Sequence, residues 1–292
     1  MRLINTTRCF ACLFLAVWPS QLLRAQILPP ANQSSPPVVD KSPTQLAALE
    51  ALNSGVEEFR NGQTERAIED FKDAKRLDPN LLNGRIYLAT SYAAQYIPGD
   101  STNPAHENGE LAVAEFREVL ALDPGNLSAL DALGSLRFQM AGSPFRRELF
   151  LDSKEYFQKH ILLSPADPEP YYWIGVIDWT LAFHANRELR TSFHLDETEV
   201  FPLSIREQYA SEYGAVIDEG IDSMNKAMAL RPDYDDAIAY LNLLYRLKAD
   251  IVASEASREE LFNRADDLID KVKEIKQKRA KPESQPEVEQ QP

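Results

Sequence analysis

Apolar residues recur three and four positions apart along most of the chain, which is the spacing of one face of an α-helix. The strict alternation typical of half-buried strands is absent. Helix-start signals agree with this period. Ser42-Pro43-Thr44-Gln45 has the form of a capping box with proline at the first helical position, and similar signals begin at Ser143, Ser204 and Ser257. The pattern predicts an all-α protein between about residues 42 and 280.

Four segments of the chain share one ending, anchored on Pro79, Pro124, Pro165 and Pro232. Eight residues before each proline is a bulky residue, namely Phe71, Phe116, Phe157 or Met224. The residue twelve positions before each proline is Ala67, Ala112, Ser153 or Gly220. The residue ten positions after it is Ala89, Gly134, Gly175 or Asn242. Small residues let two antiparallel helices approach closely, and a bulky side chain fills the space beside them. Each segment is therefore predicted to be a helical hairpin that its proline ends.

This unit resembles the tetratricopeptide repeat, a helix-turn-helix of about 34 residues. The first two units match that motif at Gly55, Gly62, Ala67, Phe71, Ala74 and Pro79, and at Leu88, Ala89, Tyr92, Ala112, Phe116 and Pro124. The next two match at Leu133, Gly134, Phe157 and Pro165, and at Ile174, Gly175, Ala227 and Pro232. The resemblance implies an α-solenoid over residues 42–256, with repeats at about 48–81, 82–126, 127–167 and 168–234 and a partial one at 235–256. A capping helix over 257–280 follows.

The repeats differ in length, because the small-residue slots from Gly55 to Asn242 are 34, 45, 41 and 67 residues apart. The proline-anchored distances stay constant, so every insertion falls between the two helices of its own unit. The insertions are Gln95–Gly109, Ala141–Leu151 and about Ala185–Ser211. In a stack of repeats, those turns are expected to project at one edge.

The first 25 residues have Arg2 and Arg8 before a ten-residue apolar run, and they contain no acidic residue. This order is typical of a secretory signal peptide cleaved after Ala25, and the run is short for a membrane span. A retained anchor is the alternative. A Pro-rich flexible leader over 26–41 and a disordered tail over 281–292 are expected to flank the repeats. The sequence thus predicts an exported protein, periplasmic or secreted, with no membrane span in the mature chain.

Composition and motifs argue against several classes of function. A net charge of -14 is unfavourable for binding nucleic acid. Both cysteines lie within residues 1–25, and no nucleotide-binding, hydrolase or zinc motif is present. The sequence therefore predicts a non-enzymatic protein without metal or cofactor. The alternative is an enzyme, metal site or ligand site built by the 185–211 insertion, with His184, Arg187, His194 and Asp196 beneath a lid. His160 is expected to pack between helices.

Aromatic residues supply the candidate surface. Tyr172, Val176, Trp179 and Phe183 share one helix face. By the resemblance, first helices line a concave groove, where Phe59, Phe138 and Trp179 occupy equivalent places. These six residues are the predicted site for a peptide or partner helix. The alternative is that the large insertion covers Trp179 and Phe183, which makes the stripe ordinary core. The expected function is a scaffold or adaptor of the cell envelope that binds another protein.

Overall fold

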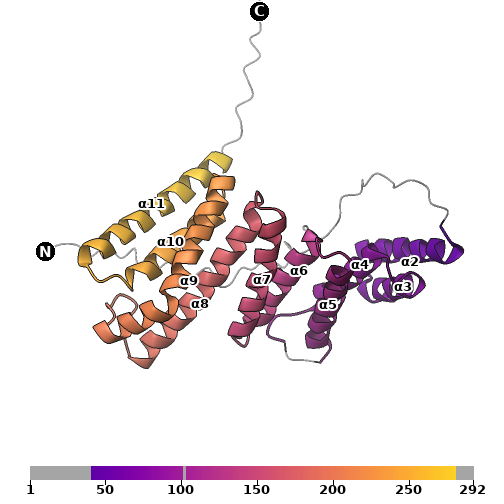
Figure 1. Cartoon of the computed structure of the whole chain (residues 1–292), viewed down its shortest axis with the longest axis horizontal. Coiled ribbons are helices and arrows are strands. Elements are labelled where there is room, and N and C mark those ends of the chain that lie inside the picture. Colours follow the sequence, from indigo (N-terminus) through magenta and orange to yellow (C-terminus); the bar gives the residue numbers. More distant parts are fainter. Residues whose placement is uncertain (1–40, 101–102, 281–292) are drawn as a thin grey trace, which may run out of the picture. The chain divides into compact units, whose positions relative to one another are not determined.

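The computed structural model describes residues 41–100 and 103–280. The predicted signal peptide, the tail and all of the leader except Lys41 lie outside the described residues. Within the described part, every regular element is a helix (Figure 1), so the all-α prediction is confirmed. The chain divides into two compact units, one up to Pro124 and the other from Gly125.

The first unit contains two helical hairpins. They are α2 (Pro43–Arg60) with α3 (Thr64–Leu77), and α4 (Leu82–Gln95) with α5 (Asn103–Leu122). The capping box at the start of α2 is present, since Ser42 Oγ accepts from Gln45 N and Gln45 Oε1 accepts from Ser42 N. Helix α3 packs against α4, so the second hairpin stacks on the first.

The second unit contains three more hairpins. They are α6 (Leu127–Ala141) with α7 (Arg147–Leu163), α8 (Pro168–Ser192) with α9 (Leu203–Leu230), and α10 (Asp235–Ala249) with α11 (Glu255–Ala280). Successive hairpins stack, because α7 packs against α8 and α9 against α10. Helix α8 also packs against α10, so the first helices of these two repeats are neighbours.

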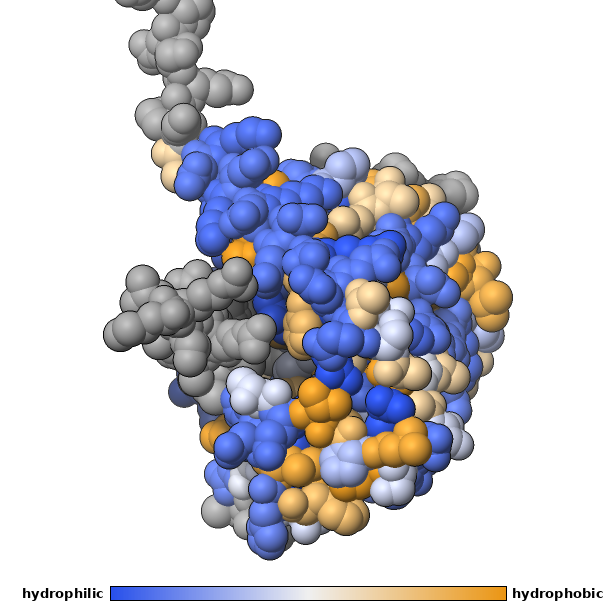
Figure 2. Space-filling model, turned by 90° about the vertical axis from the view of Figure 1, so that its left-hand side faces the viewer, coloured by the Kyte–Doolittle hydropathy of each residue, from blue (hydrophilic) through white to orange (hydrophobic). Residues whose placement is uncertain are grey.

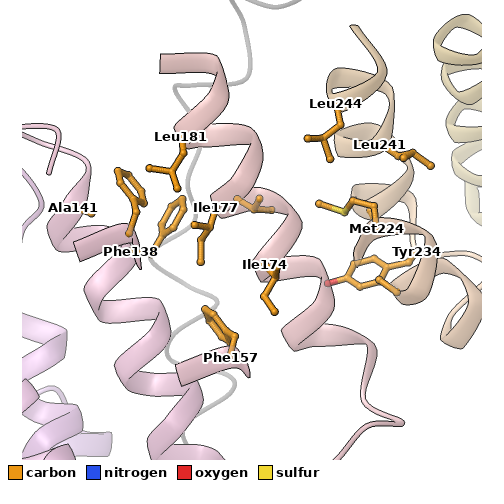
Figure 3. Packing of buried hydrophobic residues seen from close by; sticks show 14 residues of the cluster. Phe138, Ala141, Phe157, Ile174, Ile177, Leu181, Met224, Tyr234, Leu241 and Leu244 are labelled. Carbon is orange, nitrogen blue, oxygen red and sulfur yellow. The ribbon is translucent and has the colours of Figure 1, made fainter. Parts of the chain in front are cut away.

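The predicted pairing of a small residue with a bulky one holds the hairpins together. A β-carbon on Gly134 would lie 2.6 Å from the Phe157 ring, closer than packed carbons approach. A β-carbon on Gly175 would meet Met224 at the same distance. These glycines are needed for close approach of the two helix backbones. The bulky side chains opposite them then fill the core of the second unit, to which α6 to α10 all contribute (Figure 3).

In the fifth hairpin, the larger residue of this pair is on the first helix and the smaller one is on the second. Asn242 occupies the small-residue slot, and the residue facing it on α11 is the fully buried Ala265, whose carbonyl accepts from Asn242 Nδ2. Helix α11 therefore pairs with α10 as a second helix does, although no sequence motif marks it. Its outward surface is largely hydrophilic (Figure 2), as a helix that ends a stack requires.

Helix α9 begins at Leu203, one residue before the signal at Ser204, with Pro202 at its N-cap. Two other helix starts differ from the sequence signals. Helix α7 begins at Arg147 and not at Ser143, whose peptide bond to Pro144 is cis within a tight turn. Helix α11 begins at Glu255, and Ser254 Oγ accepts from Ser257 N, so Ser254 fills the place expected of Ser257. Neither difference moves a hairpin out of the repeat.

The turns within the hairpins of the second unit lie together. Phe145, in the α6–α7 turn, stacks on His184 of α8 with ring centroids 3.5 Å apart. Arg147 donates to Tyr213 of α9 at 2.7 Å. Asp250, in the α10–α11 turn, pairs with Arg190 of α8 at 2.9 Å. Projection of the insertions at one edge is thus confirmed for this unit.

Candidate functional site

A continuous row of five aromatic side chains runs between α8 and α10. Neighbouring ring centroids are 5.0 Å apart for Tyr234 and Tyr172, 5.8 Å for Tyr172 and Tyr240, 5.3 Å for Tyr240 and Trp179, and 4.9 Å for Trp179 and Phe183. The rings of Tyr172 and Trp179 each meet Tyr240 edge to face, a preferred aromatic geometry. We call these five residues the aromatic row.

Four members of the aromatic row are half-buried, and Tyr234 is buried. The row rests on the core of the second unit, where Val176 and Ile177 of α8 are fully buried. Packing from below fixes the rings, and the remaining area faces outward. The row is therefore a firmly supported surface with apolar area left over.

The structure brings together only part of the predicted site. Tyr172, Trp179 and Phe183 lie in the aromatic row, as their shared helix face predicts. Val176 has no exposed area and Phe138 is 9% exposed, so both lie in the core beneath the surface. Phe59 is half-buried on α2 of the first unit.

Sequence reasoning missed Tyr240 of α10 and Tyr234, which is the N-cap residue of α10. One signal could have found Tyr240, because it lies two residues before the Asn242 slot, as Trp173 lies two residues before Gly175. Trp173 packs against Phe138 of the preceding first helix, and Tyr240 packs against α8 in the same way. Residues at the same place in successive repeats lie on the same side of a stack. The spacing along α8 alone could not show which side chains of α10 would meet it.

The large insertion lengthens the α8–α9 hairpin instead of forming a lid. Helix α8 continues to Ser192 and α9 begins at Leu203, so only residues 193–202 are non-helical. A second core forms there around Phe201, Tyr209 and Ile217, with Trp179 and Phe183 packed against its side. The insertion thus supports one end of the aromatic row and leaves its rings half-exposed.

Of the four polar residues named for the insertion, three line one hollow and His184 lies apart from them. His184 stacks on Phe145, whereas Arg187 pairs with Glu197 at 2.8 Å. His194 and Asp196 line a shallow hollow together with Arg187 and Arg190. Across residues 41–100 and 103–280, no three His, Cys, Asp or Glu side chains are grouped as metal ligands would be.

Three carboxylates surround the Tyr234–Tyr172 end of the aromatic row. Glu169 accepts from Arg231 and from the Tyr234 hydroxyl, each at 2.7 Å, and Asp235 accepts from Arg279 at 2.9 Å. Asp236 has neither a hydrogen bond nor an ion pair with any described residue. Burial raises the pKa of Tyr240 to about 12, and the negative charge of Asp236 adds to the effect. Two of these three carboxylates are thus paired with arginines, and Asp236 is the one without an ion pair among the described residues.

Two buried charged clusters tie helices together away from the row. Lys154 of α7 contacts Asp178 of α8 at 2.5 Å and Glu219 of α9 at 2.9 Å. His160 is 1% exposed and lies 2.6 Å from Asp131, so its predicted packing between helices is confirmed. Burial lowers the pKa of His160, but the hydrogen bond and charge of Asp131 outweigh it and raise the pKa overall. Both clusters are explained by their helix-bridging contacts.

No described helix is both long enough and apolar enough to cross a membrane. The described helices are α2 to α11, and the first 40 residues lie outside them.

Comparison with known proteins finds structural likeness alone. No protein-family profile and no curated protein matches the chain. A crystal structure of MamA protein aligns with a TM-score of 0.55 and 17% identity, covering 82% of this chain and 97% of that one. A structure of MamA from Desulfovibrio magneticus RS-1, from residue 41 to its end, aligns with a TM-score of 0.54 and 17% identity. The alignment covers 80% of this chain and 98% of that one. A structure of YrrB, described as a TPR protein with an unusual peptide-binding site, aligns with a TM-score of 0.49 and 15% identity. The alignment covers 80% of this chain and 91% of that one.

Identities this low establish the fold and nothing more. The MamA alignments extend over most of both chains, and the hairpins carry the small and bulky residues at the places that the repeat requires. The chain therefore has the tetratricopeptide-like fold of stacked helical hairpins, ended by a capping helix.

Proposed function

We propose that this chain is a non-enzymatic protein-interaction module that binds a peptide or partner helix on the aromatic row. Tyr172, Trp179 and Phe183 would contact the partner, with Val176 and Phe138 as buried support and Phe59 as the equivalent contact in the first unit. The observation that carries the proposal is the row itself. Aromatic side chains that are held rigidly and left half-exposed are the usual anchors of protein interfaces.

The arrangement of helices supports the same assignment. The row spans the first helices of two successive repeats, so a bound segment would contact α8 and α10 together. Tyrosine and tryptophan lose little side-chain entropy on binding, because only two torsions are fixed and packing already restricts them here. A preorganised face of this kind favours an extended or helical segment over a small polar ligand.

Replacing Trp179 by alanine should weaken peptide binding at least tenfold. A random dodecapeptide library displayed on phage is selected on the full chain, and the best peptide is synthesised with a fluorescent label. Fluorescence anisotropy then gives Kd for both proteins. The loss is expected because Trp179 is half-buried and lies between the rings of Tyr240 and Phe183.

Leu162→Ala is the matched control, since this side chain is 83% exposed on α7 and makes no part of the row. Its Kd should stay within twofold of the wild type. Circular dichroism and thermal unfolding of both variants separate lost binding from lost fold. Equal affinity of folded Trp179→Ala and wild type would remove the row from the interface.

We also propose that the chain is exported and acts in the periplasm or outside the cell. The order of charge, apolar run and small residue in residues 1–25 supports this. Expressed with its native N-terminus in a Gram-negative host, the chain recovered from the periplasm should begin at Gln26. N-terminal sequencing and intact mass measure the start. A full-length chain found only in the cytoplasm or held in the membrane would contradict cleavage.

A further inference from the structure

We propose that the corner formed by Tyr172, Tyr240 and Asp236 receives a lysine or arginine side chain of the bound segment. This inference rests on the proposed function, and it adds the chemistry of the partner to it. The aromatic row would hold the apolar part of that segment, while the corner would hold its cation.

Two tyrosine rings that meet edge to face, nearly at a right angle, line the corner. The rings of Tyr172 and Tyr240 lie 5.8 Å apart at an interplanar angle of 78°. Asp236 precedes Tyr240 by four residues on α10, so both side chains lie on the same helix face. Burial is the main cause of the raised pKa of Tyr172 and of Tyr240, and the negative charge of Asp236 adds to both shifts.

Asp236 is the carboxylate at this end that the fold leaves without a partner. Arg231 neutralises Glu169 and Arg279 neutralises Asp235. Lys276 and Arg279 of α11 act on Asp236 through space, yet neither forms an ion pair with it. Burial is nevertheless the main cause of the raised pKa of Asp236. An incoming cation would therefore gain an ion pair that no side chain of the described unit supplies.

Lysine and arginine fit this corner better than other groups. A cation near the face of a tyrosine ring is attracted by the ring, and the attraction grows as water is removed. A carboxylate beside the rings adds a charge-assisted hydrogen bond. An anionic side chain would be repelled by Asp236 and by the chain's net charge of -14. A metal ion is a poor candidate, because the described residues offer no group of three ligands here.

The row also sets a spacing for the partner. Trp179 and Phe183 lie one and two ring-to-ring steps beyond Tyr240, of 5.3 and 4.9 Å. An extended chain advances about 3.3 Å per residue. A basic residue in the corner therefore places an apolar residue over Trp179 or Phe183 about two or three positions away.

The dodecapeptide selection described above tests this inference. Peptides selected on the full chain should be enriched in lysine or arginine about two or three positions from an apolar residue. Selection on Asp236→Asn should lose the basic residue and keep the apolar one. For a peptide chosen on the wild type, Asp236→Asn should weaken binding at least tenfold, and it should change binding less than twofold once glutamine replaces the peptide's lysine.

Asp222→Asn on α9 is the matched control, because Asp222 is also exposed and makes no hydrogen bond or ion pair with a described residue. Its effect on Kd should stay within twofold. Selected peptides without basic enrichment, or unchanged affinity of Asp236→Asn, would overturn the inference. If Trp179→Ala still abolished binding in that case, the proposed function would stand without it. Failure to select any peptide would remove both.

Discussion

Arg190→Ala should lower the free energy of unfolding by about 3 kcal/mol, the low end of the range for breaking a buried ion pair. The guanidinium is 7% exposed and donates to Asn186 Oδ1, to Asp250 Oδ2 and to the carbonyls of Asp196 and Glu199. It also lies over the ring of the buried Phe201, 4.5 Å from its centroid. One side chain therefore holds the α8–α9 turn closed and joins it to the α10–α11 turn. Urea denaturation measures the change.

Arg187 provides the control, three residues earlier on the same helix. Its side chain is 52% exposed and pairs with Glu197, itself 55% exposed, so Arg187→Ala should cost about 0.5 kcal/mol or less. Hydrogen exchange should separate the two variants locally, because backbone amides of residues 193–202 lose protection only when Arg190 is removed. Similar small losses for both variants would show that packing around Phe201 holds the turn without the guanidinium.

The hairpins could be predicted because the residues that mark each one lie at fixed, short distances along the chain. A small residue and a bulky one at fixed distances from a proline describe which two helix faces meet, and Gly134 with Phe157 shows that contact directly. The second helix of the fifth hairpin could not be recognised from the motif. In this hairpin the larger residue, Asn242, is on the first helix and the smaller one, Ala265, is on the second, and the two still pack together. Such a contact depends on how the volumes of the two residues fit each other, and a pattern of single positions does not record that.

The extent of the insertion was harder to predict than its place. Residues 185–192 simply continue α8, and Arg190 within them is paired with Asp250 of a turn that is distant in sequence. Likewise, Tyr172, Trp179 and Phe183 could be grouped by helical spacing, while Tyr240 and Asp236 joined them through packing of α8 on α10. Periodicity identifies a face of one helix, and tertiary contact determines what completes it.

Asp178→Asn should remove a dependence of stability on pH between about 4 and 7. Asp178 is fully buried on α8, and burial raises its pKa from 3.8 to about 7 even though Lys154 opposes the shift. Within that window the folded protein keeps a proton on Asp178 that the unfolded chain has released. The stabilisation is complete below pH 4 and is lost as the pH rises to 7, at about 1.4 kcal/mol per pH unit or about 4 kcal/mol in total.

The difference in unfolding free energy between wild type and Asp178→Asn isolates this group, because the other titrating residues cancel. Urea denaturation at pH 4, 5, 6 and 7 should show the wild type losing stability relative to the variant at each step. Asp222→Asn, at an exposed position of α9, is the control for the loss of one carboxylate. A flat difference for Asp178→Asn would mean that Lys154, at 2.5 Å, keeps the buried carboxylate ionised. The contact between α7 and α8 would then be a permanent ion pair instead of one that weakens in acid.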